Sequence, residues 1–472
     1  MRVVLFHPRG HACRGGRRSI GSLAAVLAPL GLASIAAVLR QQGHRVSILD
    51  ASLDTRLPNE EWVRRILSFH PDVVGFSAIT AAFNDACDVC RKVKQCDAAI
   101  TTVFGGVHAS WGGATLLREH DCIDAIIAGE GEHAFARFCN GDNPAAIAGL
   151  QYRDGPAIRS APPQERSSLC CMDELPFPAW DLVEGFPARY HLPLFSYPRA
   201  PGTHLVSSRG CVYQCSYCDR SVFNRTFRWN SPEYTFEQMR MLVADFGIRH
   251  VYFYDDLFTL NRERVERLCS LLRTAPFRVT FNCIVRIGHI DAELITLLKS
   301  AGCWMVNVGI ESGDQAILDS HKEGLRIEDI RRDVWRLHRS GLYVKGLFMM
   351  GFPGETESSV RATIELACSL PLKDANITAF TPFPGAPITA EIERLGRFDN
   401  DWDKLDCMNV VFEPASLPDK AYLQRSYGEF IRRFYNRPFA RHMYLRMLRD
   451  APHSYLRLAR NLQTFLGFAR AV

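Results

Sequence analysis

Short apolar runs rich in β-branched residues alternate with amphipathic stretches over the first 140 residues of the chain. Runs of the first kind are typical of buried strands, and apolar positions that recur every three to four residues are typical of helices. The predicted strands are residues 3–7, 46–50, 73–79, 101–104 and 125–128, and the predicted helices are residues 29–42, 60–69, 84–94 and 112–119. Because parallel strands need crossover helices, this alternation predicts a doubly wound, Rossmann-like α/β domain of the flavodoxin type over residues 1–140.

Ligands of doubly wound sheets bind beyond the carboxyl ends of the strands. The loops at that edge are residues 8–21, 77–83, 105–110 and 129–132. We therefore expect any ligand of this first domain to contact these four loops.

A second alternating series follows a proline-rich connector, residues 141–200. Its predicted strands are residues 204–208, 250–254, 279–285, 305–310, 347–350 and 376–380, and its predicted helices are residues 232–245, 262–274, 292–300, 327–340 and 358–369. Six βα units over residues 201–400 predict a partial (β/α)6 barrel, with its chemistry at the carboxyl ends of the strands. Basic helical segments dominate residues 401–472 and predict a helical carboxy-terminal cap.

Composition adds few constraints to this two-domain arrangement. The net charge of +5 is spread along the chain, and no basic and aromatic recognition motif accompanies it, so we expect no nucleic acid partner. The 16 cysteines lack the regular spacing of a disulfide framework, which favours a reducing cytoplasm. Residues 19–39 carry no charge, but Pro29 and Gly43 bracket a predicted globular helix, so we expect no membrane span.

Three cysteines directly follow the first predicted strand of the second series. The segment Arg209-Gly210-Cys211-Val212-Tyr213-Gln214-Cys215-Ser216-Tyr217-Cys218 places three thiols within eight residues. Such a loop can bind three irons of a [4Fe–4S] cluster and leave the fourth iron open. A structural zinc site needs four ligands, and the nearest additional candidate, His204, falls inside a predicted strand. Zinc binding and plain core packing are the weaker alternatives.

The CxxxCxxC spacing after a first barrel strand resembles the signature of the radical SAM superfamily. The resemblance implies that Cys211, Cys215 and Cys218 hold a [4Fe–4S] cluster whose open iron binds S-adenosylmethionine (SAM). One-electron reduction would then cleave SAM to methionine and a 5′-deoxyadenosyl radical.

Further segments of the predicted barrel resemble SAM-binding segments of that superfamily. Asp255 and Asp256 end the second strand, where relatives place groups that face the methionine amine; an alternative is a helix-capping pair. Asn282 and Arg286 are similar to residues that contact the ribose or carboxylate of SAM, and solvent exposure is their alternative. Glu311 and Ser312 belong to a GIESG-like segment, in which this polar pair would bind SAM.

The first domain resembles the cobalamin-binding domain of one large radical SAM branch. The matching segments run from Pro29 to His44 and include Val74-Gly75-Phe76-Ser77, Gly105-Gly106-Val107-His108 and Gly129-Glu130-Gly131-Glu132. The DxHxxG motif that supplies an axial histidine to cobalt is absent, so cobalamin would bind without a protein imidazole. The resemblance implies that the loop with Ser77 and Thr80 lies under the corrin. It also implies that Gly105, Gly106, His108, Gly129 and Glu130 contact the corrin or its nucleotide tail, although His108 could equally be a solvated loop residue.

Together these resemblances imply a cobalamin-dependent radical SAM C-methyltransferase that uses the 5′-deoxyadenosyl radical and methylcobalamin. The alternative is an oxidative cyclase or rearrangement enzyme, similar to the anaerobic ring-forming enzymes of chlorophyll synthesis. From a different class, a non-catalytic cobalamin or redox-binding protein would also fit. The expected partners are a small-molecule, lipid or natural-product substrate and a low-potential electron donor of the flavodoxin or ferredoxin type.

Overall fold

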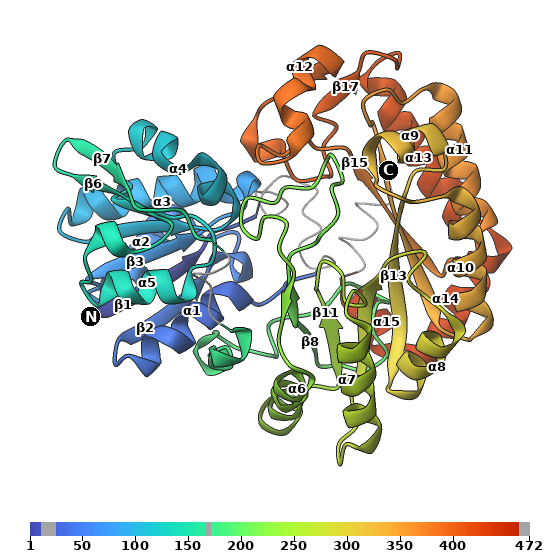
Figure 1. Cartoon of the computed structure of the whole chain (residues 1–472), viewed down its shortest axis with the longest axis horizontal. Coiled ribbons are helices and arrows are strands. Elements are labelled where there is room, and N and C mark those ends of the chain that lie inside the picture. Colours follow the sequence, from blue (N-terminus) through green and yellow to red (C-terminus); the bar gives the residue numbers. More distant parts are fainter. Residues whose placement is uncertain (11–24, 166–170, 462–472) are drawn as a thin grey trace.

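The computed structural model describes residues 1–10, 25–165 and 171–461, which form two α/β units and a helical cap (Figure 1). The expected ligand loop at residues 8–21 and its cysteine, Cys13, therefore fall largely outside the described residues. The first unit is coloured blue to teal in Figure 1, and the second runs from green to orange.

The first unit is built on a seven-stranded sheet of order β2-β1-β3-β4-β5-β6-β7. Its strands are β1 (Arg2–His7), β2 (Arg45–Asp50), β3 (Val73–Ser77), β4 (Thr101–Gly105), β5 (Ala125–Ile127), β6 (Leu150–Asp154) and β7 (Ala157–Ser160). The first five pair in parallel, and β6 and β7 add in antiparallel fashion. The order 2-1-3-4-5 confirms the predicted flavodoxin-type domain, with its switch point between β1 and β3.

Helices cover both faces of this sheet. They are α1 (Leu30–Gln41), α2 (Asn59–Ser68), α3 (Phe83–Cys96), α4 (Val107–Glu119) and α5 (Glu132–Cys139). Val3 and Leu5 of β1 pack in one core with α1 and α5, whereas Val4 and Phe6 pack in the core on the opposite face. Burial on both faces explains why β1 is a continuous apolar run.

The second unit is a curled, all-parallel sheet of order β15-β14-β13-β12-β11-β8. Its strands are β8 (Gly202–Leu205), β11 (His250–Phe253), β12 (Thr280–Val285), β13 (Cys303–Glu311), β14 (Tyr343–Met350) and β15 (Asp374–Ala379). Its helices are α6 (Pro232–Phe246), α7 (Arg262–Thr274), α8 (Ala292–Ser300), α9 (Gln315–His321), α10 (Ile327–Arg339) and α11 (Glu357–Ser369). This arrangement confirms the predicted partial barrel.

Side-chain caps fix where several barrel helices begin. Ser231 accepts a hydrogen bond from the Tyr234 amide at 3.1 Å, and Asn261 accepts one from the Arg264 amide at 3.0 Å. Each cap satisfies an amide that the first helical turn leaves unpaired. Because α6 and α7 lie in the crossovers after β8 and β11, their starts lie at the carboxyl edge of the sheet, where the site is expected.

The chain after β15 forms a small hairpin and a helical cap. This part contains α12 (Ile392–Leu395), β16 (Gly396–Phe398), β17 (Phe412–Pro414), α13 (Lys420–Tyr435), α14 (Pro438–Asp450) and α15 (Pro452–Arg460). The hydroxyl of Tyr435 donates to Asp374 at 2.7 Å, and that of Tyr444 approaches the same carboxylate at 3.5 Å. Asp374 starts β15, whereas the hydroxyl of Tyr427 donates to the carbonyl oxygens of Met350 and Thr378 near the carboxyl ends of β14 and β15, so α13 runs along the edge of the sheet between its two ends.

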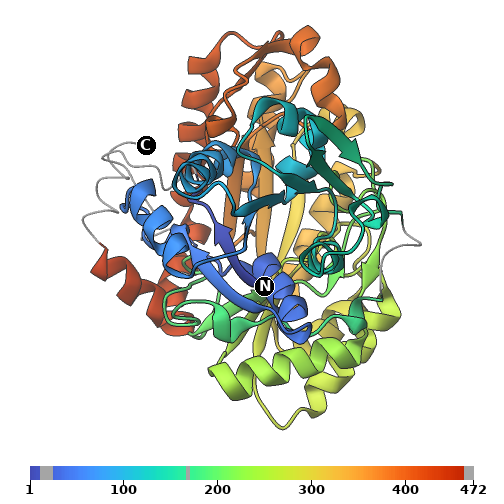
Figure 2. The ribbon, with the colours of Figure 1, turned by 90° about the vertical axis from the view of Figure 1, so that its left-hand side faces the viewer.

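The two sheets face each other across the middle of the molecule. Seen from the side in Figure 2, the first unit lies in front of the strands of the second. Within the described ranges, no helix combines the length and apolar character needed to cross a bilayer.

Candidate functional site

A loop of residues 210–227, here called the cysteine loop, joins β9 (Ser208–Arg209) to β10 (Arg228–Trp229). These short strands pair in antiparallel fashion, with Arg209 opposite Arg228, and close the loop at its base. Gly210 has a φ of +85°, and a β-carbon there would lie 2.1 Å from the carbonyl oxygen of Thr226. Only glycine permits this close approach, so the residue before Cys211 is required by the shape of the loop.

The structure brings the three thiols of this loop together. Cys215 is buried, Cys211 is half-buried and Cys218 is exposed. A hydrogen bond from the Cys218 thiol outweighs the effect of burial and, with the nearby Lys322 ammonium group, lowers the pKa of Cys215 to about 6. Burial raises the pKa of Cys211, and negative charge at Asp256 and Cys215 raises it further. The loop therefore favours the thiolate of Cys215, which is the form that binds iron.

A cluster and a zinc site place different demands on the three thiols. Among the described residues, no three His, Cys, Asp or Glu side chains converge as ligands of one metal ion. In a [4Fe–4S] cube each thiolate binds a different iron, whereas a zinc site needs converging ligands.

Three consecutive residues at the end of α9 hold the cysteine loop. The carbonyl oxygen of His321 accepts from the Ser216 amide at 3.1 Å, and the His321 ring lies 2.9 Å from the Ser216 hydroxyl. On the other side of Cys215, Glu323 accepts from the Gln214 amide at 2.9 Å. Lys322, between these two contacts, is buried beside the cysteines. The sequence alone does not indicate a role for this segment, because its contacts join positions 105 and 109 residues apart.

Replacing Lys322 with methionine should make a cluster in the cysteine loop harder to reduce. A buried cation beside thiolates favours the more negative, reduced state of a cluster, so its loss should lower the midpoint potential. The expected change is on the order of 1 kcal/mol, or about 45 mV for one electron. An EPR-monitored redox titration measures it. Lys322→Arg keeps the charge and should keep the potential, and equal potentials in all three proteins would contradict the prediction.

The two predicted carboxylates, Asp255 and Asp256, have different surroundings. Asp255 is fully buried and accepts from the Ser207 amide at 2.6 Å, the Ser207 hydroxyl at 2.7 Å and the Ser208 hydroxyl at 2.6 Å. Arg264 contacts it at 3.3 Å. These contacts occupy both carboxylate oxygens, so the expectation that Asp255 faces a methionine amine is not met. Asp256 is exposed and accepts from the Gly210 amide at 3.1 Å, beside the first cysteine.

Asn282 lies within β12 and Arg286 directly follows this strand, and the two side chains have different surroundings. Asn282 is fully buried; its amide donates to the carbonyl of Ser196, and its Oδ1 accepts from no described group. The Arg286 guanidinium stacks on the ring of Tyr213, 3.5 Å from its centroid, and donates to the carbonyl of Glu323. Arg286 therefore braces the cysteine loop, and neither side chain is the freely solvated residue considered as an alternative.

Glu311 and Ser312 lie at the carboxyl end of β13. Glu311 has a φ of +65° and accepts from Lys322 at 2.6 Å. A β-carbon on Gly309 would lie 2.6 Å from both Oε1 of Glu311 and Nζ of Lys322, so this glycine makes room for the ion pair. Ser312 is buried and its hydroxyl lies 3.2 Å from that of Thr363. Glu311 thus faces the cysteine loop, whereas Ser312 ties β13 to α11.

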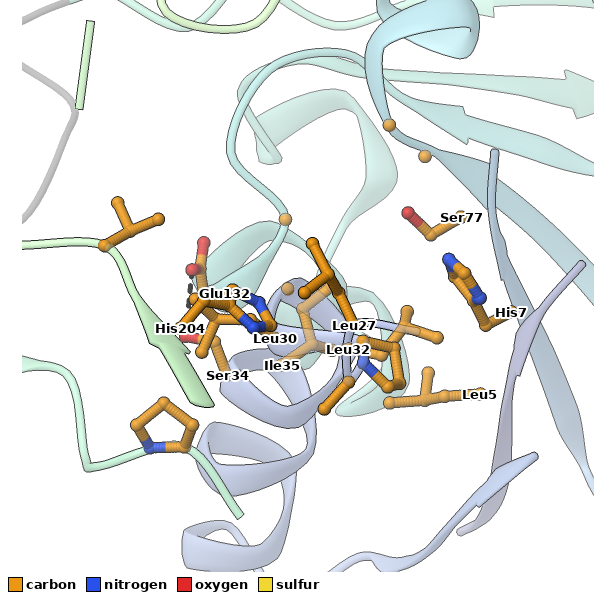
Figure 3. Close-up of a pocket in the computed structure, with 18 of the residues that line it drawn as sticks. Leu5, His7, Leu27, Leu30, Leu32, Ser34, Ile35, Ser77, Glu132 and His204 are labelled. Atoms are coloured by element: carbon orange, nitrogen blue, oxygen red, sulfur yellow. Dashed lines mark hydrogen bonds between the residues drawn. The ribbon is translucent and has the colours of Figure 1, made fainter. Parts of the chain in front are cut away.

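A cavity of about 1100 Å³ lies between the two units, at the carboxyl edges of both sheets (Figure 3). Five predicted residues of the first domain line it: Ser77, Gly105, Gly106, Gly129 and Glu130. The barrel contributes His204, Arg209, Tyr234, Gln238 and Tyr254. Figure 3 shows side chains from β1, α1, β8 and the segment before α1 gathered around this space, including His7, Leu30, His204 and Leu27.

Two predicted residues, Thr80 and His108, do not line this cavity. Both are buried, with the His108 ring 3.3 Å from the Thr80 hydroxyl. Phe83 and Trp402 enclose the imidazole at ring distances of 4.3 and 4.4 Å. Burial lowers the pKa of His108 to about 4, so the ring is neutral at physiological pH. His108 is therefore neither a solvated loop residue nor a wall of the cavity.

Sequence reasoning missed a pair of polar residues at the ends of β1 and β2. His7 and Asp50 are register partners, and their side chains are 3.0 Å apart. The hydroxyl of Tyr190 donates to the other oxygen of Asp50 at 3.0 Å. Burial disfavours a charged imidazole, but Asp50 outweighs it and raises the pKa of His7. Both residues end predicted strands at the ligand edge, which was the available signal.

Comparison with protein families assigns both units. Residues 18–138 match the B12 binding domain, and residues 205–367 match the radical SAM superfamily. An uncharacterized methyltransferase of Pyrococcus horikoshii is 32% identical over 364 residues, which cover 76% of each chain. The anaerobic magnesium-protoporphyrin IX monomethyl ester cyclase of Rubrivivax gelatinosus is 26% identical over 455 residues, covering 93% of this chain and 78% of the cyclase.

Two solved structures share the whole arrangement. The cobalamin-dependent SAM radical enzyme OxsB matches with a TM-score of 0.69 at 16% identity, over 98% of this chain and 72% of that chain. The radical SAM methyltransferase TsrM of Kitasatospora setae, with cobalamin and a [4Fe–4S] cluster bound, matches with a TM-score of 0.67 at 19% identity, over 88% of this chain and 82% of that one. At these identities the two structures establish the fold.

Proposed function

The chain belongs to the radical SAM superfamily, in the branch that carries an amino-terminal B12-binding domain, and we propose that it methylates an unactivated carbon. The observation that supports this proposal is one cavity shared by the two units. Arg209, two residues before the first cysteine, and the glycine turn at Gly129 both line it. Two cofactors held by different domains could therefore meet one substrate within contact distance.

The cavity suits cobalamin in size and position. Its volume of about 1100 Å³ is slightly larger than that of most ligand pockets, and it lies at the topological switch point of the first sheet. A β-carbon on Gly31, at the start of α1, would meet no atom within 4 Å, so this wall is open to a ligand. When bound, cobalamin carries the methyl group and the cluster supplies the electron that cleaves SAM.

We assign roles to this chain's own residues on the basis of their surroundings. Cys211, Cys215 and Cys218 would bind three irons of the cluster. Asp256 and Glu311 are the carboxylates beside the cysteine loop and are our candidates for the SAM amine, with Asn282 offering a buried, unpartnered oxygen. Ser312, Arg286 and Asp255 would act indirectly, by fixing the elements that carry these groups.

The cluster needs an external reductant and a reducing environment. We propose a low-potential donor of the flavodoxin or ferredoxin type, and a cytoplasmic location. The 14 cysteines in the described part of the chain are all free, including the adjacent pair Cys283 and Cys303, which supports a reducing compartment.

Two products of SAM distinguish the candidate functions without knowledge of the substrate. The reconstituted protein is incubated anaerobically with SAM, cobalamin and titanium(III) citrate, and nucleosides are measured by mass spectrometry. A methyltransferase should form both S-adenosylhomocysteine, from methyl transfer, and 5′-deoxyadenosine, from reductive cleavage. The alternative is a cyclase, which is supported by the match of the Rubrivivax cyclase over 93% of this chain. A cyclase should form 5′-deoxyadenosine alone. Formation of neither would contradict both enzymatic proposals.

A further inference from the structure

A buried ionic network joins the base of the cysteine loop to the glycine turn of the first domain. The Glu130 carboxylate accepts hydrogen bonds from both Arg209 and Arg228, the facing residues of β9 and β10. Glu132 accepts from Arg209 at 2.5 Å and from the Ser34 hydroxyl of α1 at 3.0 Å. Two strands of the barrel unit therefore meet the glycine turn, α5 and α1 of the first unit in one network.

The network is well shielded from solvent. The side chains of Arg209, Glu130 and Glu132 are 14%, 9% and 8% exposed. Burial disfavours the ionised form of Glu132, but the Arg209 guanidinium outweighs it and lowers the pKa of this carboxylate. The Arg209 guanidinium therefore favours the ionised form of Glu132, and buried ion pairs of this kind are screened by salt far less than surface pairs.

The position of the network gives it a role beyond general stability. Arg209 lies two residues before Cys211, and Glu130 follows Gly129 in the turn that lines the cavity. Glu130 was expected to contact the nucleotide tail of a cofactor, but two guanidinium groups already occupy its carboxylate. Arg209 bridges the two carboxylates with its two terminal nitrogens, and Glu130 bridges the two guanidinium groups with its two oxygens, so the network fixes orientation as well as distance.

We propose that Glu130, Glu132, Arg209 and Arg228 are positioning residues that fix the cysteine loop relative to the cavity wall of the first domain. This inference rests on the proposed function in one respect, that a cofactor is held on each side of the network. The ion pairs then set the separation between the two cofactors, while other residues bind them.

Two variants and a matched control test the proposal in the full-length protein loaded with cluster and cobalamin. Glu130→Gln and Glu132→Gln remove charge without changing shape. Asp181→Asn is the control, because Asp181 also pairs with α1, through Arg40 at 2.6 Å, but that pair is exposed on both sides. Hydrogen–deuterium exchange followed by mass spectrometry reports local opening and does not require turnover. Amides of residues 129–135 and 208–229 should exchange at least tenfold faster in Glu130→Gln and should be unchanged in Asp181→Asn.

A spectroscopic readout separates positioning from folding. In frozen samples that contain both cob(II)alamin and the reduced cluster, magnetic coupling between the two centres depends on their separation. The coupling should weaken in Glu130→Gln, with iron and cobalamin contents retained, and should be unchanged in the control. Wild-type exchange and wild-type coupling in Glu130→Gln would overturn the proposal.

A double variant keeps the test decisive if Glu130→Gln folds poorly. Removing one partner of a buried pair is more harmful than removing both, because the remaining charge stays unpaired. Glu130→Gln with Arg228→Gln should therefore recover cofactor content while retaining fast exchange and weak coupling. Slow exchange in the double variant would overturn the proposal. Neither readout depends on methyl transfer. The positioning role can therefore hold in a protein that shows no methyltransferase activity, and it can fail in a protein that is an active methyltransferase.

Discussion

Replacing Cys215 with alanine should abolish the [4Fe–4S] cluster and reduce formation of 5′-deoxyadenosine from SAM to background. Cys215 is the central and most buried of the three cysteines, and its pKa of about 6 makes it the thiol most readily ionised. Two thiolates leave a second iron without a protein ligand, so the cluster should be lost during reconstitution. Iron and sulfide analysis, the visible absorption of the cluster and nucleoside analysis measure the outcome.

Two other cysteines provide controls for this experiment. Cys269 is buried in α7, and its replacement with alanine tests the packing cost of losing a buried sulfur. Cys96 is exposed at the end of α3 and tests for nonspecific thiol chemistry. Both variants should keep the full iron content and SAM cleavage. A Cys215→Ala protein with wild-type iron content would contradict the assignment of the cysteine loop.

Local patterns were sufficient to predict the five parallel strands of the first sheet and the six strands of the second. The strands β1, β3 and β11 are short apolar runs because helices or the other unit cover both of their faces, and such runs are visible in the sequence. The helix α5 was missed because it has only eight residues and begins at Glu132, inside a segment interpreted as a loop. A short helix leaves too few positions for its periodicity to be recognised.

The hairpin β6–β7 shows a signal that was present and was overlooked. Asp154 and Gly155 form a dipeptide typical of hairpin turns, and Gly155 has a φ of +60°. Pro156 follows directly, and the proline content of residues 141–200 favoured a connector. The hairpin instead extends the first sheet at β5.

In the candidate site too, features set by neighbouring residues were predictable, whereas contacts between distant residues were not. The cysteine spacing is local, so the sequence alone predicted a cluster loop. By contrast, Glu130 and Arg209 are separated by 79 positions and lie on different domains. Nothing in a single sequence indicates how two domains dock, so the buried network and the contacts of Lys322 emerged only from the structure.

The second large effect is expected at Asp255. A stability measurement there distinguishes a structural role in the barrel from a direct role in binding SAM. Asp255→Asn should lower the free energy of unfolding by about 3–5 kcal/mol, because it leaves the Arg264 guanidinium buried without a counter-charge. The Arg264 and Asp255 side chains are 2% and 0% exposed, so water cannot replace the lost partner. Neutralisation also weakens the bonds that Asp255 accepts from Ser207 and Ser208. Denaturant-induced unfolding, followed by circular dichroism, measures this change.

An exposed ion pair of the same barrel is the control for this measurement. Glu237→Gln removes the partner of Arg240 on α6, where the side chains are 46% and 52% exposed, and should cost less than about 1 kcal/mol. If Asp255 instead bound SAM directly, the opposite pattern is expected: Asp255→Asn would have a stability near wild type and strongly reduced SAM cleavage. Because Ser207 and Ser208 directly precede the cysteine loop, loss of their anchor should also mobilise that loop. Asp255 would then influence SAM cleavage through the position of the cysteines, and Asp255→Asn should lose stability and cluster content together.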